Sequence, residues 1–478
     1  MIAINSFVNY MLYPADNLKI ILAVILAISF IFRRSPLASK IYDAFSKIPV
    51  KPSLIIILAV SFALRLFWIF WSQHVPPAPI SEDILIWTHA KDLVAGYGFR
   101  SYWTQQPTAF RPIGYPLVLA GLFKLFGPHL VLAEILQVFL NVLCVFCVFY
   151  ISKQIVSPQF GLLAALLYGF YPTAIMSTKI LLDEHLFLVL WMVSIILLIS
   201  DFQKPAWSKV IVAGFATGLS AIFRTYSIIT CGIAFVVWAV AKRNFAGAVK
   251  RGAVIAFLTV LCAVPWGVRN YLRFGAPVLW TTAIGTNMYF ANNPTSNVRY
   301  PVNPDLEHGG DPGFLTPNLS EIQKDYAGRK AAMNWIKNNP LIFVDKMIGR
   351  GFYMMGFDPE GWVIDDNFTN LKSGAQPPSR RTKKFLMKTE QAYYFVAFIF
   401  ALIGSIIYFI QKKSSGKEEG MIYIIVTVLL YIFATVVALG HRKYKFPIEP
   451  FLCILAAYGI TQIFFGHVTE RMKKSMLS

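Results

Sequence analysis

Long apolar runs separated by short polar segments occupy most of the chain, and this pattern predicts an all-α polytopic membrane protein. A helix needs about 20 mostly apolar residues to cross the hydrocarbon core of a bilayer. Eleven runs approach this length, and we expect each to form a membrane-spanning helix. They occupy residues 18–33, 53–72, 130–151, 159–176, 180–200, 208–225, 227–241, 252–266, 391–411, 420–440 and 447–466.

One further apolar run, from Gly114 to Phe126, is too short to be counted as a span. Counting it would invert every later loop and would place the basic segment 242–251 outside the cell. We therefore expect a helix that lies at the outer membrane interface, with Lys124 reaching toward the lipid headgroups.

Composition and charge agree with a membrane protein. Hydrophobic residues make up 56% of the chain and charged residues only 14%. The net charge of +20 would suggest nucleic-acid binding in a soluble protein, but here the basic residues fill short loops. Every second loop is basic, which places those loops in the cytoplasm, the N-terminus outside and the C-terminus inside. The five cysteines lie within apolar runs and imply no disulfide framework.

These boundaries divide the chain into four parts. Residues 1–52 form an extra N-terminal helix and a basic cytoplasmic loop, and residues 53–266 form a transmembrane core that includes the first outer loop, 73–129. Residues 267–390 form an α-rich outer region, with an amphipathic helix expected from Leu319 to Asn338 and Asp325 on its polar side. Residues 391–478 form the last helices and a basic tail.

The candidate chemistry lies at the outer ends of the predicted helices. The first outer loop carries two adjacent carboxylates, Glu82 and Asp83, followed by Arg111. Later outer turns carry a second acidic pair and several cations, namely Lys179, Asp183, Glu184, Arg224, Arg269, Arg442 and Lys443. Because a helical bundle brings its outer ends together, we expect one cavity with acids near its centre and cations around it.

This combination suits the transfer of a sugar from a lipid phosphate. Arg and Lys side chains can bind the phosphate and stabilise its charge as the glycosidic bond breaks. A carboxylate can take the proton of the attacking acceptor, and a single base implies inversion at the anomeric carbon. Two plainer interpretations remain open: Glu82 and Asp83 cap an interfacial helix that runs to Leu93, and the arginines reach only to lipid headgroups.

The order of several short motifs resembles the GT-C superfamily of glycosyltransferases, in particular a bacterial branch related to protein O-mannosyltransferases and lipid A aminoarabinose transferases. The resemblance begins in the first outer loop, with Glu82-Asp83 and the segment 107–116, and extends along most of the chain. Later motifs are Phe170-Tyr-Pro, Leu181-Leu-Asp-Glu184, Gly218-Leu with Arg224, Pro265-Trp-Gly-Val-Arg-Asn270, Gly285-Thr-Asn, Asn292-Asn-Pro, Trp335-Ile with Asn339-Pro, and His441-Arg-Lys-Tyr-Lys-Phe-Pro.

The resemblance implies a polyprenyl-phosphate-sugar donor, a catalytic carboxylate in the first outer loop and a second acidic position at Asp183 or Glu184. The family aspartate aligns with Glu82, and a shift of one residue brings in Asp83, which we slightly prefer. Candidate acceptor or sugar-binding residues are Tyr115, Trp266, Asn270 and Asn287. The resemblance also leaves a divalent metal ion open, with no ligands assigned.

The expected function is therefore an inverting transferase that moves a sugar from an undecaprenyl-type carrier to a lipid-linked or cell-surface glycan, or to a protein, on the outer face of a bacterial inner membrane. An oligosaccharide polymerase or ligase is an alternative, but it gives Glu82 and Asp83 no role. A transporter or flippase of such lipids is another alternative, although it favours polar residues and broken helices near the membrane midplane.

Overall fold

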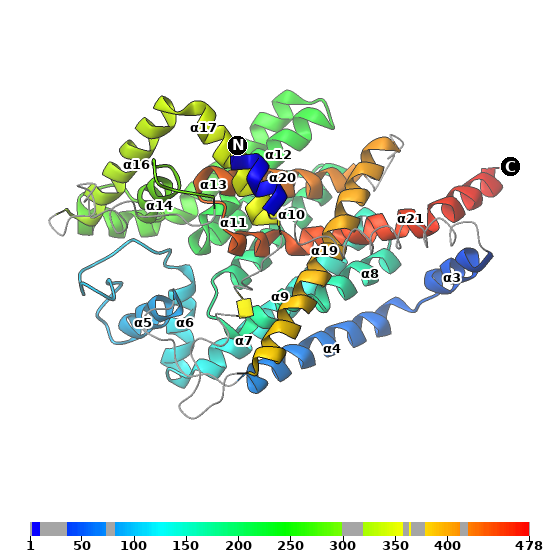
Figure 1. Cartoon of the computed structure of the whole chain (residues 1–478), viewed down its shortest axis with the longest axis horizontal. Coiled ribbons are helices and arrows are strands. Elements are labelled where there is room, and N and C mark those ends of the chain that lie inside the picture. Colours follow the sequence, from blue (N-terminus) through cyan, green and yellow to red (C-terminus); the bar gives the residue numbers. More distant parts are fainter. Residues whose placement is uncertain are drawn as a thin grey trace.

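The elements named in the computed structural model are α-helices and short 3₁₀-helices (Figure 1). The structure describes residues 2–9, 36–72, 82–298, 319–356, 363–364, 378–411 and 419–477, and within these ranges the side chains of residues 36, 82–83 and 467–477 are not described. In the described ranges the extended contact is a single isolated bridge between Arg100 and Pro107. The predicted all-α fold is confirmed.

Seven helices in the described part of the chain are long and apolar enough to cross a membrane. Each coincides with a run predicted from the sequence, so the prediction of an integral multi-pass membrane protein is confirmed. They are α4 (Val50–Trp71), α7 (Leu130–Ile155), α10 (Glu184–Gln203), α13 (Phe245–Phe274), α19 (Arg380–Ile410), α20 (Met421–Ala438), and the segment Arg442–Gly466, which joins η6 (Arg442–Ile448) to α21 (Glu449–Leu477).

The predicted number of eleven spans is not confirmed. The run 159–176 forms a bent pair, α8 (Pro158–Gly169) followed by Pro172–Lys179, with an angle of 60° between the parts. If this pair is one span, the described residues contain eight. The break has a local cause, because Tyr171 precedes Pro172 and takes an extended conformation that a helix cannot continue through.

Two further predicted runs form helices that are shorter than the other spans. The run 208–225 is α11 (Trp207–Phe223), and the run 227–241 is η4 (Thr225–Ile228) followed by α12 (Ile229–Val240). The remaining predicted run, 18–33, lies outside the described residues. The short run expected at the interface is indeed a helix, α6 (Gly114–Phe126), and its position at the membrane surface stays a prediction.

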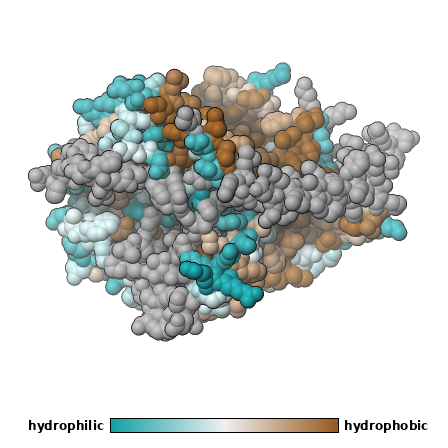
Figure 2. All heavy atoms as spheres, in the orientation of Figure 1, coloured by the Kyte–Doolittle hydropathy of each residue, from teal (hydrophilic) through white to brown (hydrophobic). Residues whose placement is uncertain are grey.

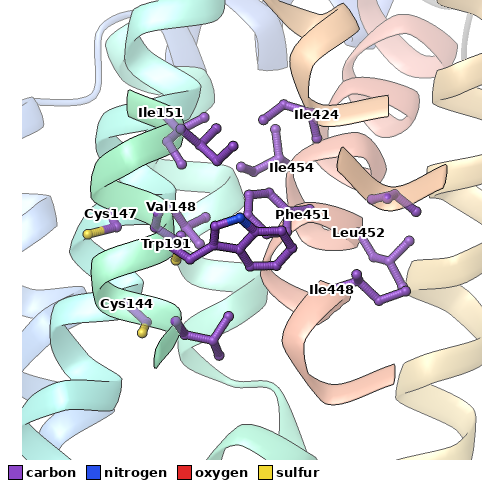
Figure 3. Close-up of a cluster of buried hydrophobic side chains, with 14 of the residues drawn as sticks. Cys144, Cys147, Val148, Ile151, Trp191, Ile424, Ile448, Phe451, Leu452 and Ile454 are labelled. Carbon is purple, nitrogen blue, oxygen red and sulfur yellow. The ribbon is translucent and has the colours of Figure 1, made fainter. Parts of the chain in front are cut away.

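The core of the bundle is an apolar cluster around Trp191 of α10, which is fully buried (Figure 3). The Trp191 ring meets Phe451 of α21 edge to face, with 5.3 Å between centroids, and its indole nitrogen donates to Thr230 Oγ1 at 3.0 Å. Cys144 and Cys147 of α7 lie in the same cluster as free thiols. Because both thiols are buried among apolar side chains, we interpret this pair as part of the apolar packing of the core.

Helices α19 and α21 cross at two glycines. A β-carbon built on Gly404 would overlap the carbonyl oxygen of Leu455, and one built on Gly459 would overlap the carbonyl oxygen of Phe400. Small residues at a helix crossing let two backbones approach closely, which is a common way to pack helices in membranes. This contact fixes α19 against α21, the helix that begins directly after the η6 turn.

The polar elements gather at one end of the bundle, opposite α3 (Pro36–Ser46) and the C-terminus (Figure 1). At this end lie α5 (Glu82–Val94), α6, α14 (Ala283–Ala291), α16 (Glu321–Asn338) and α17 (Pro340–Met355). On the face drawn in Figure 2, hydrophilic side chains are frequent near this end, and hydrophobic ones are frequent toward the other end. Exposed apolar residues of the helices include Ile55, Phe67, Leu219, Phe257 and Phe433.

The outer region contains the predicted amphipathic helix, α16, which begins with a capping box between Ser320 and Gln323. One detail was wrong: Asp325, predicted on the polar side, is buried against α14. It accepts from the backbone nitrogen of Gly285 at 2.6 Å and pairs with Arg329 at 2.7 Å. The cause is a close crossing at Gly285, where a β-carbon would overlap the backbone of α16.

Candidate active site

An arginine joins the second acidic pair where three segments meet. Asp183 precedes α10, Glu184 is its first residue, and Arg224 follows the end of α11 in an extended conformation. Arg224 Nε lies 2.7 Å from Asp183 Oδ1, and Nη2 lies 2.7 Å from Glu184 Oε1. Both acids are buried, with 6% and 3% of their surface exposed. The structure therefore brings Arg224 to an acidic pair that the sequence placed in a different outer turn.

Further cations approach this cluster from two other segments. The charge of Lys443, in η6, acts on Glu184, and the charge of Arg111, in the first outer loop, acts on Asp183. Burial raises the pKa of the Asp183 carboxyl to about 7, against the opposing charge of Arg224. Two adjacent carboxylates thus face one bound guanidinium and lie within the electrostatic reach of two further cations.

The first outer loop starts with the other acidic pair. Helix α5 begins at Glu82, as the capping interpretation required, and ends one residue beyond the predicted Leu93. The side chains of Glu82 and Asp83 lie outside the described part, so their catalytic role stays a prediction. After α5 the loop folds back, because Arg100 holds Asp92 through two hydrogen bonds of 2.8 and 3.0 Å.

Two other residues attach this loop to the rest of the outer surface. Arg269 of α13 donates to the carbonyl oxygens of Phe99 at 2.7 Å and Thr108 at 2.8 Å. Glu321 of α16 accepts from Thr108 Oγ1 at 2.6 Å and from the nitrogen of Ala109 at 2.7 Å. The loop is thereby fixed on two sides, which is what positioning a catalytic carboxylate requires.

Residues 110–268 match the sequence model of the family described as dolichyl-phosphate-mannose-protein mannosyltransferase. The matched segment, about a third of the chain, contains Arg111, the acidic pair 183–184 and Arg224. The chain also has the fold of the apo oligosaccharyltransferase of Archaeoglobus fulgidus, with a TM-score of 0.52 and 11% identity over 89% of this chain and 52% of that chain. Over residues 110–268 this match agrees with the resemblance to protein O-mannosyltransferases that the sequence motifs indicate.

Two other solved structures are also similar to the chain. One is the archaeal oligosaccharyltransferase AglB of Archaeoglobus fulgidus with an inhibitory peptide and a dolichol-phosphate (TM-score 0.47, 12% identity, 88% of this chain and 52% of that chain). The other is ArnT from Cupriavidus metallidurans bound to undecaprenyl phosphate (TM-score 0.44, 11% identity, 85% and 77%). No curated protein sequence is significantly similar to the chain.

The chain spans about half the length of the oligosaccharyltransferase structures that it matches. At these identities the likeness shows the fold. The enzyme class that the sequence predicts therefore stays a proposal for this chain. The same holds for the sugar, the acceptor and the individual site residues.

Three residues of the predicted site hold the fold in place. Besides its contacts to the loop, Arg269 lies over the Trp266 ring, 4.7 Å from its centroid, and donates to Asn270 Oδ1. Trp266 donates to the carbonyl of Trp280 at 2.9 Å, and Asn270 to that of Val278 at 2.8 Å. These contacts give no support to phosphate or sugar binding by Trp266, Arg269 or Asn270, and those roles stay predictions.

The contacts described for the other predicted binding residues are made with other parts of the bundle. Lys179 donates to the carbonyl of Ile69 at 3.0 Å, and the charge of Glu134 acts on its ammonium group. Lys179 therefore faces the α4–α7 side of the bundle. Tyr115 is fully buried in α6, and Asn287 is half-buried in α14. Arg442 is buried with its guanidinium 4.3 Å from the centroid of the Tyr353 ring, which leaves Lys443 as the more accessible cation of that turn.

A buried polar network behind the acidic pair was not predicted from the sequence. Arg65 of α4 donates to Asn141 Oδ1 at 2.7 Å and to the carbonyl of Gly169 at 2.8 Å. Asn141 Nδ2 lies 3.3 Å from His185 Nδ1, and His185 Nε2 lies 3.2 Å from the Ser177 carbonyl. The sequence does carry a signal for this network, because Arg65 and His185 are ionisable residues within apolar runs. Such residues are rare in membrane helices and are candidates for a functional role. This network ties the break after α8 to the first turn of α10.

A cavity of about 550 Å³ lies beside the first outer loop. Its walls come from α5, the loop 101–111, the end of α13 and the start of α16. His89 lies in the α5 wall and is 3% exposed, and its ring packs on Phe99 with 4.2 Å between centroids. Burial, helped by the charge of Arg111, lowers the pKa of His89 to about 4, so the ring is neutral at physiological pH.

This pKa predicts a specific dependence of stability on pH. In the unfolded chain His89 titrates near its ordinary value of 6.5, so between pH 6.5 and 4 the unfolded state binds its proton more readily. The free energy of unfolding should therefore fall as pH falls through this window, by about 3 kcal/mol at its lower end. Thermal melts of the parent and of His89→Gln from pH 7 to 4 measure this, since the variant lacks the titrating ring. Equal pH dependence in both would contradict it.

In the described part of the chain no three His, Cys, Asp or Glu side chains converge as a metal site. Residues 82 and 83 are not covered by this statement, because their side chains are not described. A divalent metal ion therefore remains an implication of the family resemblance and enters no step below.

Proposed function

We propose that this protein is an inverting glycosyltransferase that moves a sugar from a polyprenyl-phosphate donor to a lipid-linked or cell-surface glycan, or to a protein. The observation that carries the proposal is the buried cluster of Asp183, Glu184 and Arg224 with Lys443 and Arg111 beside it. Four of these five residues lie within the segment that matches a family of lipid-phosphate-dependent mannosyltransferases.

The donor phosphate is assigned to the cationic side of this cluster. Lys443 and Arg111 approach the acids from η6 and from the first outer loop, and a phosphate between them would receive charge-assisted hydrogen bonds from both. Arg224 is held by the two acids, so its guanidinium is fixed in direction before the ligand arrives. Fixed donors stabilise developing charge without reorganisation, which is the main electrostatic source of catalysis.

The reaction itself needs few participants. An acceptor hydroxyl oxygen attacks the anomeric carbon, and the bond from that carbon to the phosphate oxygen breaks, with its electron pair leaving on the phosphate. The hydroxyl proton passes to a carboxylate at the start of α5, for which Glu82 and Asp83 are the candidates. Attack from the face opposite the leaving phosphate inverts the configuration of the sugar.

The site is assigned to the outer face of a bacterial inner membrane. The basic loops support this orientation, because short cytoplasmic loops carry an excess of Lys and Arg. The polyprenyl tail of the donor would lie against the exposed apolar surface of the spanning helices while its phosphate meets the cluster at their ends. A position at the end of the bundle favours this proposal over a transporter, which needs its polar site near the membrane midplane.

The test is transfer of radiolabelled sugar by the purified protein in lipid nanodiscs. A panel of polyprenyl-phosphate sugars is offered with and without a membrane extract as acceptor source. We expect release of polyprenyl phosphate with at least one donor and formation of a labelled product of inverted anomeric configuration. The same protein in liposomes measures movement of the donor between leaflets. Leaflet transfer without bond cleavage for every donor would replace this proposal by the flippase alternative.

A further inference from the structure

The cavity beside the first outer loop has an unusual balance of charge. Three of the residues that line it are cationic, namely Arg111, Arg273 and Lys324, and one is acidic, Glu321. The Glu321 carboxylate already accepts three hydrogen bonds, from Thr108 Oγ1, the nitrogen of Ala109 and Thr282 Oγ1. The acid is therefore engaged with the walls, whereas two of the cations, Lys324 and Arg273, are available to a ligand.

Two of the cations have no other task among the described residues. The ammonium of Lys324 and the guanidinium of Arg273 make no hydrogen bond or ion pair within the described part of the chain, although both line the cavity. Lys324 lies one turn into α16, and Arg273 lies at the end of α13, so they come from different walls of the cavity. Such an arrangement attracts an anionic group placed between them.

The remaining lining includes aromatic and polar side chains beside the aliphatic Leu85, Pro107 and Leu319. Tyr102, Trp103, Phe110 and Phe274 contribute rings, and Trp103 is 65% exposed. Flat aromatic faces pack well on the C–H face of a pyranose ring, while the hydroxyls of Ser101 and Thr104 provide hydrogen-bonding groups. A cavity of this volume with aromatic walls and a few polar groups is typical of a small-molecule site.

We propose that this cavity binds the acceptor, and that the acceptor is a saccharide with an anionic group, a phosphate or a carboxylate. The proposal rests on the proposed function, and it names the substrate class of the same site. The cavity is next to the predicted base, because Leu85 and His89 of the lining lie one and two turns beyond Glu82 on α5.

Arg111 connects the cavity to the donor cluster. It lines the cavity, and its charge acts on both His89 and Asp183. An acceptor in the cavity would therefore approach a donor phosphate held near Asp183 from the side of the first outer loop. The neutral state of His89 leaves the cationic character of the cavity to Arg111, Arg273 and Lys324 at neutral pH.

Binding of three matched sugars tests the proposal directly. Glucose, glucose 6-phosphate and glucuronate differ only at carbon 6, and their affinities for the full-length protein in nanodiscs can be measured by calorimetry. We expect at least one anionic sugar to bind about 10 to 100-fold more tightly than glucose, since charge-assisted hydrogen bonds replace neutral ones. Preference for the phosphate or for the carboxylate then identifies the anionic group.

Paired substitutions assign this preference to the cavity. Lys324→Gln combined with Arg273→Gln should remove the preference for the anionic sugar, and the matched control Lys330→Gln, on the exposed side of the same helix, should keep it. Equal binding of all three sugars by the parent, or a preference that survives in the double variant, would overturn the proposal. Release of polyprenyl phosphate from donor without acceptor is measured in parallel, so a failure of the proposed function is seen separately.

Discussion

Replacing Glu82 with Gln is expected to lower the rate of sugar transfer by about 10² to 10⁴-fold, the usual contribution of a general base. Asp83→Asn should have a much smaller effect. The distinction follows from helix geometry, because successive residues of an α-helix are separated by about 100°. Position 82 shares the face of α5 on which Leu85 and His89 line the cavity, whereas position 83 belongs to the neighbouring face.

The measurement is single-turnover transfer by each variant at saturating donor, with thermal stability recorded beside it. Glu82→Gln keeps the size of the side chain and removes its charge, so its melting temperature should stay close to that of the parent. A large loss in Asp83→Asn with a mild effect at position 82 would restore Asp83, the residue slightly preferred from the sequence, as the base. Full activity in both variants would remove the first outer loop from the chemistry.

The sequence predicted the overall architecture because hydrophobic length is a direct physical requirement of the bilayer. Seven of the predicted runs are spanning helices in the described part of the chain. The count failed where length alone could not decide. The run 159–176 contains Pro172, which breaks the helix, and the turn at Arg224 separates the short helices α11 and α12. Apolar composition does not distinguish these cases from full spans.

The candidate site was predictable in part for a related reason. Acids and arginines at the ends of apolar runs must find partners, so the positions of Asp183, Glu184 and Arg224 along the chain are enough to group them. The partner of each cation could not be read from the sequence. Arg269 looks like Arg224 in its surroundings along the chain, yet its donors are used on loop carbonyls. Only the folded position of the first outer loop shows that Arg269 binds loop carbonyls, whereas Arg224 binds two carboxylates.

The contacts of Glu321 could not be predicted from sequence motifs either. It begins a polar helix in a region where acids are usually solvated, and nothing in its neighbourhood points to a partner more than two hundred residues earlier. In the structure it accepts from the loop backbone and from Thr282, and so it fixes one wall of the cavity. Long-range contacts of this kind depend on how the outer elements dock, which local patterns do not encode.

The second large effect is expected at Arg224, and the chain offers a matched control for it. Arg251 of α13 forms a similar buried ion pair with Asp201, at 2.6 Å, at the other end of α10. Removing one partner of a buried pair leaves an uncompensated charge and costs about 3 to 5 kcal/mol. Arg224→Gln and Arg251→Gln should therefore lower the melting temperature to a comparable extent, which thermal unfolding in nanodiscs measures.

Their effects on transfer should differ, because only Arg224 lies in the proposed donor cluster. At a temperature where both variants remain folded, Arg224→Gln is expected to transfer sugar about 10² to 10³-fold more slowly, as when one preorganised donor to a developing anion is removed. Arg251→Gln should retain a rate near that of the parent. Equal losses in the two variants would mean that Arg224 acts through folding alone. In that event the electrostatic role of the Asp183–Glu184–Arg224 cluster would be refuted, and Lys443 and Arg111 would have to bind the phosphate without it.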